Sequence, residues 1–158
     1  MPETETVKTY QELNEVLDYV QTTHARMRAA CARVAESDPS ERIRTLMMSF
    51  ADALSDLEQV LKTASAEQPA EVLETWVQYV PTRPVDVLVE RGERVDELTW
   101  YDLAALSLQV QEEMVALYET LLEQVKAEPV QKVLETLAEA EREAGKKLSK
   151  KLLSLQEL

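Results

Sequence analysis

The segment LAEAEREAGKKL, residues 137–148, has the spacing of one half of a dimetal site. A carboxylate followed three residues later by a histidine places two metal ligands one turn apart on the same side of a helix. Here the carboxylate is Glu141, but the residue three positions on is Ala144, whose side chain has no ligand atom. The segment therefore indicates either an altered metal site or a helical core that holds no metal.

The chain has a single histidine, His24, on the apolar face of its first predicted helix and one turn after Gln21. In the second half of the chain, Gln111 takes the position that matches Gln21. If Glu141 faces the same interior, it needs a partner, because an unpaired buried carboxylate is costly. We expect Glu141 to pair with His24 or with Arg28.

Apolar residues spaced three and four apart predict four long helices, over about residues 9–36, 39–65, 99–127 and 129–156. Thr9 with Glu12, and Thr99 with Asp102, have the spacing of capping boxes at the first and third helix. Asp38 is the predicted cap of the second helix. Two glycines in 158 residues also favour long helices over sheets with tight turns.

Residues 66–98 differ from the rest and predict a crossover. Within it, residues 70–80 (AEVLETWVQYV) have the pattern of a short amphipathic helix, and residues 81–98 predict an extended connector with at most one helical turn. This segment is too long for a hairpin between antiparallel helices. It suits a connection that runs the length of a four-helix bundle.

The two halves of the chain are similar when they are overlaid with an offset of 90 residues, so that residues 20–39 lie over residues 110–129. The matched pairs are Leu13 with Leu103, Val20 with Val110, Gln21 with Gln111, and Pro39 with Pro129. Two similar helix pairs joined by a long crossover predict an all-α, left-handed four-helix bundle with pseudo-twofold symmetry, which forms a single domain over residues 1–158.

This pattern resembles the ferritin-like superfamily, and its rubrerythrin-like branch most closely. The resemblance implies a diiron site made of one Glu from each of two helices and a Glu-x-x-His motif from each of the other two. Gln21 and Gln111 stand at the two single-carboxylate positions, and Glu141 and Ala144 at the motif of the fourth helix. The second helix gives Ala51 and Leu54 in one register, and Phe50 and Ala53 in the other.

Of the six ligands that the resemblance implies, only Glu141 is present. Two iron ions carry at least four positive charges, and one carboxylate cannot offset them. We therefore expect a degenerate diiron site, with no cofactor and no catalytic residue. The leading hypothesis is a non-catalytic ferritin-like bundle with a binding or structural role.

Two other functions remain open. One is a metal-binding oxidoreductase or iron-handling protein with an altered site, built from Gln21, His24, Gln111 and Glu141. The other is a small apolar-ligand pocket where the metals would have been, beside the small residues Ala53, Ala144 and Gly145, unless Phe50 or Leu54 fills it. Cys31, two turns after His24 on the same face, is interpreted as a packed core cysteine and not as a catalytic partner of the histidine.

Most aromatic residues outside the four apolar stripes lie in or next to the crossover: Trp76, Tyr79 and Trp100. Aromatic side chains are enriched at protein interfaces, so we expect a homodimer contact or a partner site there. The alternative is that these side chains only cover the bundle.

The formal net charge of −13 argues against nucleic acid or an anionic membrane surface as a partner. A basic group near the C-terminus, Lys146, Lys147, Lys150 and Lys151, is interpreted as a complement to the helix dipole. No apolar run approaches the roughly 20 residues that span a membrane. With one cysteine and no signal-peptide pattern in MPETETVKTY, the sequence predicts a cytoplasmic protein.

Overall fold

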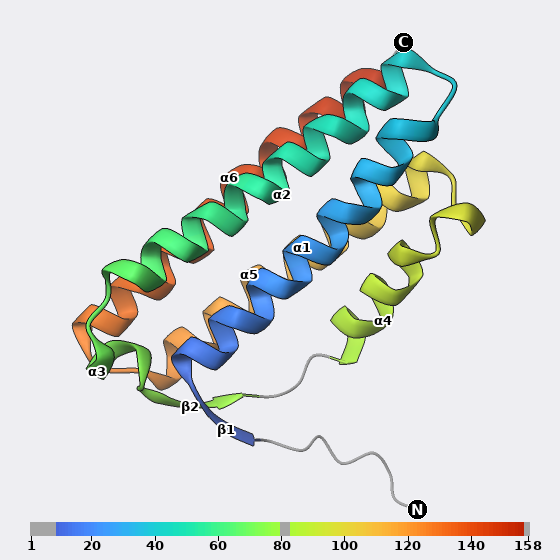
Figure 1. The fold of residues 1–158 in the computed structure, drawn as a ribbon. Helices are drawn as coiled ribbons and strands as arrows, with labels where there is room; N and C mark the ends of the chain where they lie inside the picture. The colour runs from blue at the N-terminus through green and yellow to red at the C-terminus, as the bar shows by residue number, and fades with distance from the viewer. Residues whose placement is uncertain (1–8, 80–82, 157–158) are drawn as a thin grey trace, which may run out of the picture.

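A computed structural model describes residues 9–79 and 83–156 of the chain. Four long helices form a bundle: α1 (Leu13–Ser37), α2 (Glu41–Glu67), α5 (Trp100–Gln124) and α6 (Glu128–Gln156). In Figure 1, α1 packs beside α2 and α5 beside α6, and α2 also lies along α6. The predicted all-α bundle of four long helices is confirmed.

The caps explain where three of the long helices begin. Thr99 and Asp102 form the predicted capping box of α5: the Thr99 hydroxyl accepts the Asp102 N–H at 3.0 Å, and the Asp102 carboxylate accepts the Thr99 N–H. At α2 the cap is Ser40 and not Asp38, whose carboxylate instead accepts the Ser40 N–H at 2.9 Å. The N-cap of α1 is Glu12, so the predicted start near residue 9 is wrong.

Residues ahead of α1 are extended because they pair with a segment of the crossover. Strand β1 (Thr9–Glu12) runs antiparallel to β2 (Trp76–Tyr79), and Glu12 lies opposite Trp76. The predicted amphipathic helix over residues 70–80 forms only its first turn, α3 (Ala70–Leu73), and is wrong for residues 74–79; residue 80 lies outside the described residues. Aromatic and β-branched residues favour this pairing over a helix.

One side chain of α5 bonds to both backbone polar groups of a residue in β2. The Gln124 amide accepts the backbone N–H of Gln78 and donates to its carbonyl oxygen, both at 2.6 Å. Strand β2 therefore lies beside the C-terminal end of α5.

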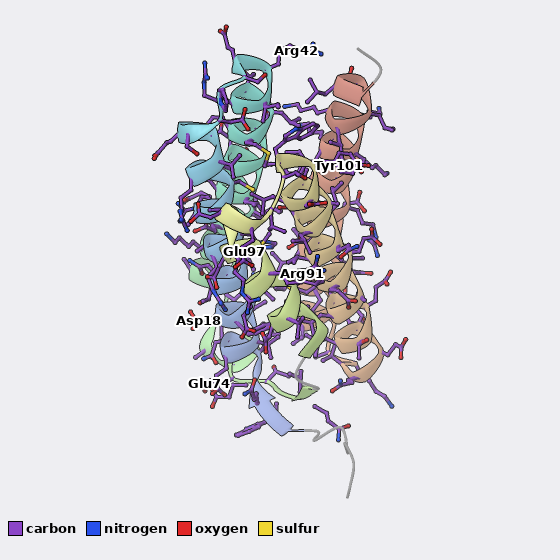
Figure 2. All side chains as sticks on the ribbon, turned by 90° about the vertical axis from the view of Figure 1, so that its right-hand side faces the viewer. Asp18, Arg42, Glu74, Arg91, Glu97 and Tyr101 are labelled. Atoms are coloured by element: carbon purple, nitrogen blue, oxygen red, sulfur yellow. The ribbon has the colours of Figure 1, made fainter. Side chains whose placement is uncertain are left out.

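The second half of the crossover is helical from residue 83, so the predicted extended connector over residues 81–98 is wrong for that part; residues 81 and 82 lie outside the described residues. Helix α4 (Arg83–Glu93) is followed by a 3₁₀ turn, η1 (Val95–Glu97). Val85 and Val89 of α4 are buried, and the helix packs against α1 and α5 (Figures 1 and 2). Polar contacts hold its outer side to α1: Tyr19 donates to Asp86 at 2.9 Å, and Arg26 pairs with Glu93 at 2.6 Å.

The apolar core runs the length of the bundle, and its largest members are fully buried side chains from all four long helices: Leu17, Met27, Met47, Phe50, Leu103, Met114, Leu121, Leu134 and Leu137. Across the described ranges, no helix has both the length and the apolar character needed to cross a membrane.

Candidate functional site

A buried ion pair joins the middle of α1 to the middle of α6. His24 Nε2 and Glu141 Oε2 lie 2.5 Å apart, and the two side chains are 0% and 2% exposed. The predicted pairing of Glu141 with His24 is confirmed. The alternative partner, Arg28, instead forms an ion pair with Glu58 of α2 across 2.5 Å.

The pair makes one strong hydrogen bond but leaves two polar atoms without a protein partner. His24 Nδ1 and Glu141 Oε1 are buried, and neither forms a hydrogen bond within the described part of the chain. Buried polar atoms without a hydrogen-bond partner cost stability. The pair therefore links two helices while it satisfies only part of its own hydrogen-bonding capacity.

Two polar side chains of α5 complete a polar core cluster, which we define as His24, Gln111, Tyr118 and Glu141. Gln111 and Tyr118 are 3% and 0% exposed. Neither atom of the Gln111 amide, nor the Tyr118 hydroxyl, forms a hydrogen bond in the described structure. Burial, with a smaller contribution from the nearby charge of Glu141, raises the pKa of Tyr118 well above its usual value, so the phenol stays protonated.

The remaining positions of the predicted metal site hold no ligand. Gln21 and Ala144 are half-buried, and Ala144 packs against the core. On α2, Phe50 is 0% and Leu54 2% exposed, so apolar side chains fill the interior there. Among residues 9–79 and 83–156, no group of three or more His, Cys, Asp or Glu side chains could hold a metal ion. These residues do not fit a diiron centre.

Cys31 is a core residue, as expected. Its Sγ lies 3.6 Å from the Ser107 hydroxyl, and its side chain is fully buried. Burial raises the pKa of the Cys31 thiol from 9.0 to about 11, and the hydrogen bond to Ser107 offsets part of this rise. A thiol held protonated in this way is a poor nucleophile.

The aromatic residues predicted to share one interface lie at opposite ends of the bundle. Trp76 is 64% exposed on β2, beside the C-terminal end of α5, whereas Trp100 begins α5 and packs partly against the core. An α-helix of this length separates them by roughly 36 Å. Figure 2 shows Glu74 and Tyr101 toward opposite ends of the bundle; Glu74 is close in sequence to Trp76, and Tyr101 to Trp100. Strand β2 ends at Tyr79, whose side chain falls outside the described residues.

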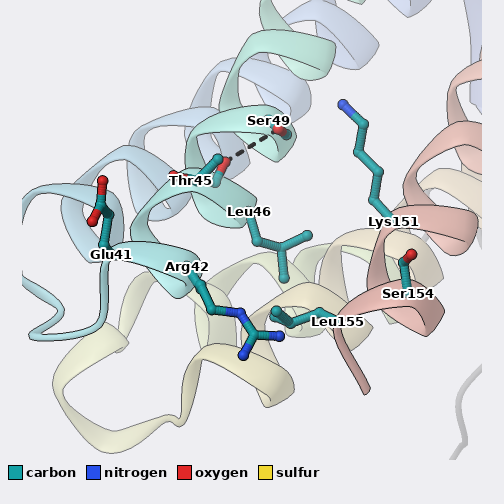
Figure 3. Close-up of a pocket in the computed structure, with 8 residues that line it drawn as sticks. All are labelled: Glu41, Arg42, Thr45, Leu46, Ser49, Lys151, Ser154 and Leu155. Carbon is teal, nitrogen blue, oxygen red and sulfur yellow. Dashed lines mark hydrogen bonds between the residues drawn. The ribbon is translucent and has the colours of Figure 1, made fainter. Parts of the chain in front are cut away.

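A groove of about 490 Å³ lies between the start of α2 and the end of α6 (Figure 3). Its lining consists of Glu41, Arg42, Thr45, Leu46, Ser49, Lys151, Ser154 and Leu155. Leu46 and Leu155 provide apolar surface between Arg42 and Lys151, and no ion pair in the described part of the chain involves either cation. The sequence showed the basic group that contains Lys151, but not the distant α2 residues that it faces.

No protein-family model, curated protein or solved structure matches this chain. The resemblance to the ferritin-like superfamily therefore has the status of a proposal.

Proposed function

We propose that this protein is a non-catalytic helical bundle of the ferritin-like type, nearest to the rubrerythrin-like branch, which acts through protein contacts. One observation carries the proposal: Glu141, the only carboxylate at the implied ligand positions, is already bonded to His24 in a buried pair. With Oε2 bonded to His24 and no second acidic side chain at the implied positions, Glu141 alone does not supply the several ligands that a metal ion requires.

The arrangement of the helices supports the ferritin-like part of the proposal. Helices α1 and α2 pack as one pair and α5 and α6 as another, and a long crossover with α3, β2 and α4 joins them. The Gln21 and Gln111 positions, 90 residues apart, fall on the two equivalent helices α1 and α5. This is the relation that two similar halves of a left-handed bundle would have.

The proposed contact is a homodimer formed through the groove between α2 and α6. In a twofold dimer the same patch meets itself, so it must carry both signs of charge around an apolar centre. Glu41 provides the negative charge, Arg42 and Lys151 the positive charges, and Leu46 and Leu155 the apolar surface. Met48 of α2 is 44% exposed. It lies on the same face of the helix as Glu41 and Thr45, so it extends the apolar surface of the groove.

Light scattering on the purified chain tests this proposal. We expect a mass near twice 18.0 kDa for the wild type. The double variant Arg42→Glu/Lys151→Glu should be a monomer, because like charges would then face each other across the twofold axis.

The matched control is Lys62→Glu/Lys126→Glu, which makes the same change in net charge at two exposed positions away from the groove and should remain dimeric. A sharp monomer of wild-type protein at about 0.5 mM would contradict the homodimer, since a contact that weak would not persist in solution.

A further inference from the structure

A second hollow opens on the other side of α6, above the polar core cluster. This cleft between α5 and α6 has a volume of about 290 Å³. It is lined by Leu108, Gln111, Glu112, Val115, Glu141, Arg142, Gly145 and Ser149. Two of these residues, Gln111 and Glu141, are polar yet 3% and 1% exposed, so they form its floor.

Three buried polar atoms at the floor of the cleft have no hydrogen-bond partner among the described residues. They are both amide atoms of Gln111 and Oε1 of Glu141, whose other oxygen bonds to His24. Buried polar groups are almost always hydrogen-bonded, so three orphaned atoms on two adjacent side chains call for a specific explanation. Leaving them unpaired costs stability, which a bound hydrogen-bonding group would recover.

Gly145 leaves space for the side-chain amide of Gln111. A Cβ atom at this position would lie 3.0 Å from Gln111 Oε1, closer than ordinary van der Waals contact. The glycine therefore lets the amide oxygen of α5 lie against the backbone of α6. Because the amide has no hydrogen bond to the described protein, turning it toward the cleft breaks none.

The charges around the cleft select a cation. Glu141 is at the floor and Glu112 is exposed at the rim, in a chain with a net charge of −13. The one cation in the lining, Arg142, is paired with Glu119 at 2.8 Å and with Glu139 at 3.6 Å. The pattern is unsuited to a carboxylate or phosphate ligand, which Glu141 would repel.

A metal ion is also a poor match, because only one carboxylate lies at the floor and bare cations need several anionic or imidazole ligands. An ammonium group brings its own N–H donors and needs only acceptors. The side chains of Leu108 and Val115 provide apolar surface for a short alkyl chain. The volume is close to the lower limit for small-molecule sites, which favours a small ligand.

We propose that the α5–α6 cleft binds a small primary alkylammonium ion, whose N–H groups donate to Glu141 Oε1 and Gln111 Oε1 and whose alkyl chain lies against Leu108 and Val115. The ammonium would give a hydrogen-bond donor to Glu141 Oε1, the carboxylate oxygen that His24 does not contact. This site is separate from the dimer groove, and neither proposal depends on the other.

Titration with n-butylammonium chloride, followed by amide chemical shifts or calorimetry, tests the proposal. We expect saturable binding, with shifts centred on α5 and α6 around Gln111 and Gly145. Tetramethylammonium has the same charge but no N–H donor, so it should bind at least about tenfold more weakly. Butyrate, with a similar chain and the opposite charge, should not bind.

Two variants test the site without breaking the His24–Glu141 pair. Gln111→Leu removes an acceptor but keeps a similar volume, and Gly145→Ala places a methyl group against the amide oxygen. Each should lower the affinity for butylammonium by about tenfold or more. The control is Glu143→Gln, which removes one negative charge from an exposed position of α6 and should change the affinity by less than about threefold.

Thermal unfolding of each variant verifies that it is folded before binding is measured. The proposal is overturned if butylammonium does not saturate below about 50 mM, a limit beyond which binding would be non-specific. Equal affinity for tetramethylammonium, or unchanged affinity in both folded variants, would equally overturn it and leave water as the partner of these atoms.

Discussion

Breaking the His24–Glu141 pair should destabilise the protein far more than breaking an exposed ion pair. The variant Glu141→Leu leaves a buried imidazole with neither ring nitrogen bonded, since Nδ1 has no partner in the described wild-type structure either. Removing one member of a buried pair costs about 3–5 kcal/mol. For a chain of this size that corresponds to a decrease in Tm of roughly 6–20 °C.

The double variant His24→Leu/Glu141→Leu separates the pair from the packing of its side chains. It removes both polar groups, and such a replacement is often neutral or stabilising. We therefore expect each single variant to lose about 3 kcal/mol or more and the double variant to lose much less than their sum. Urea unfolding followed by circular dichroism measures these free energies.

Glu93→Gln is the matched control, because Glu93 forms an ion pair with Arg26 in which both side chains are about 40% exposed. Exposed pairs contribute about 0–1 kcal/mol, so this variant should unfold almost as the wild type does. The reasoning would be refuted if Glu141→Leu cost no more than Glu93→Gln, or if the single-variant losses simply added in the double variant.

Three further predictions concern other buried or capping groups. Cys31 should resist iodoacetamide at pH 8, because a pKa of about 11 leaves on the order of 0.1% of the thiol as thiolate. It should react fully once urea unfolds the chain. Intact-protein mass spectrometry measures both reactions. Because burial raises the pKa values of Cys31 and Tyr118, the stability that each contributes is complete below its unfolded pKa and declines as pH rises beyond about 9 for Cys31 and about 10 for Tyr118; for Cys31 the loss is about 2 kcal/mol at pH 11. Urea unfolding from pH 8 to 11 should thus show a shallower decline for Tyr118→Phe than for the wild type, and an equal decline would contradict this. Thr99→Ala should cost about 1 kcal/mol through loss of the α5 cap, whereas Thr120→Ala, at an exposed position inside the same helix, should not.

The sequence was sufficient to place the four long helices because their apolar spacing is a local signal. It also placed the cap of α5 and limited the partner of Glu141 to His24 or Arg28. The prediction about Glu141 followed from the cost of an unpaired buried carboxylate, because Glu141 and its candidate partners were assigned to the same interior. The partners lie 117 positions apart, so no local pattern could have revealed their distance.

The crossover was predicted less well, because its structure depends on contacts between distant segments. Residues 76–79 are extended because they pair with residues 9–12. Their aromatic and β-branched side chains favour a strand, but the sequence does not show which segment they pair with. In α4, Pro84 near the start and buried Val85 and Val89 fit a helix, but the β-branched residues lower its local propensity. Packing against α1 and α5 decides the outcome.

The orphaned atoms of Gln111 and Tyr118 could not be predicted from residue types. The sequence places both on the apolar face of α5, but only the three-dimensional arrangement shows that nothing in the described protein bonds to them. The sequence marked Gly145 as a small residue that could leave space in the core, but not the close approach of the Gln111 side chain from another helix.

Metal content measured by mass spectrometry tests the central claim most directly, namely that the core holds an ion pair and not a metal centre. The protein is analysed as purified and again after anaerobic incubation with Fe(II), Mn(II) or Zn(II) and desalting. We predict less than about 0.1 equivalent of any metal, because one carboxylate already bonded to His24 cannot retain an ion through desalting. About one or two equivalents that are lost in Glu141→Ala would contradict the claim and reveal a metal site in this core.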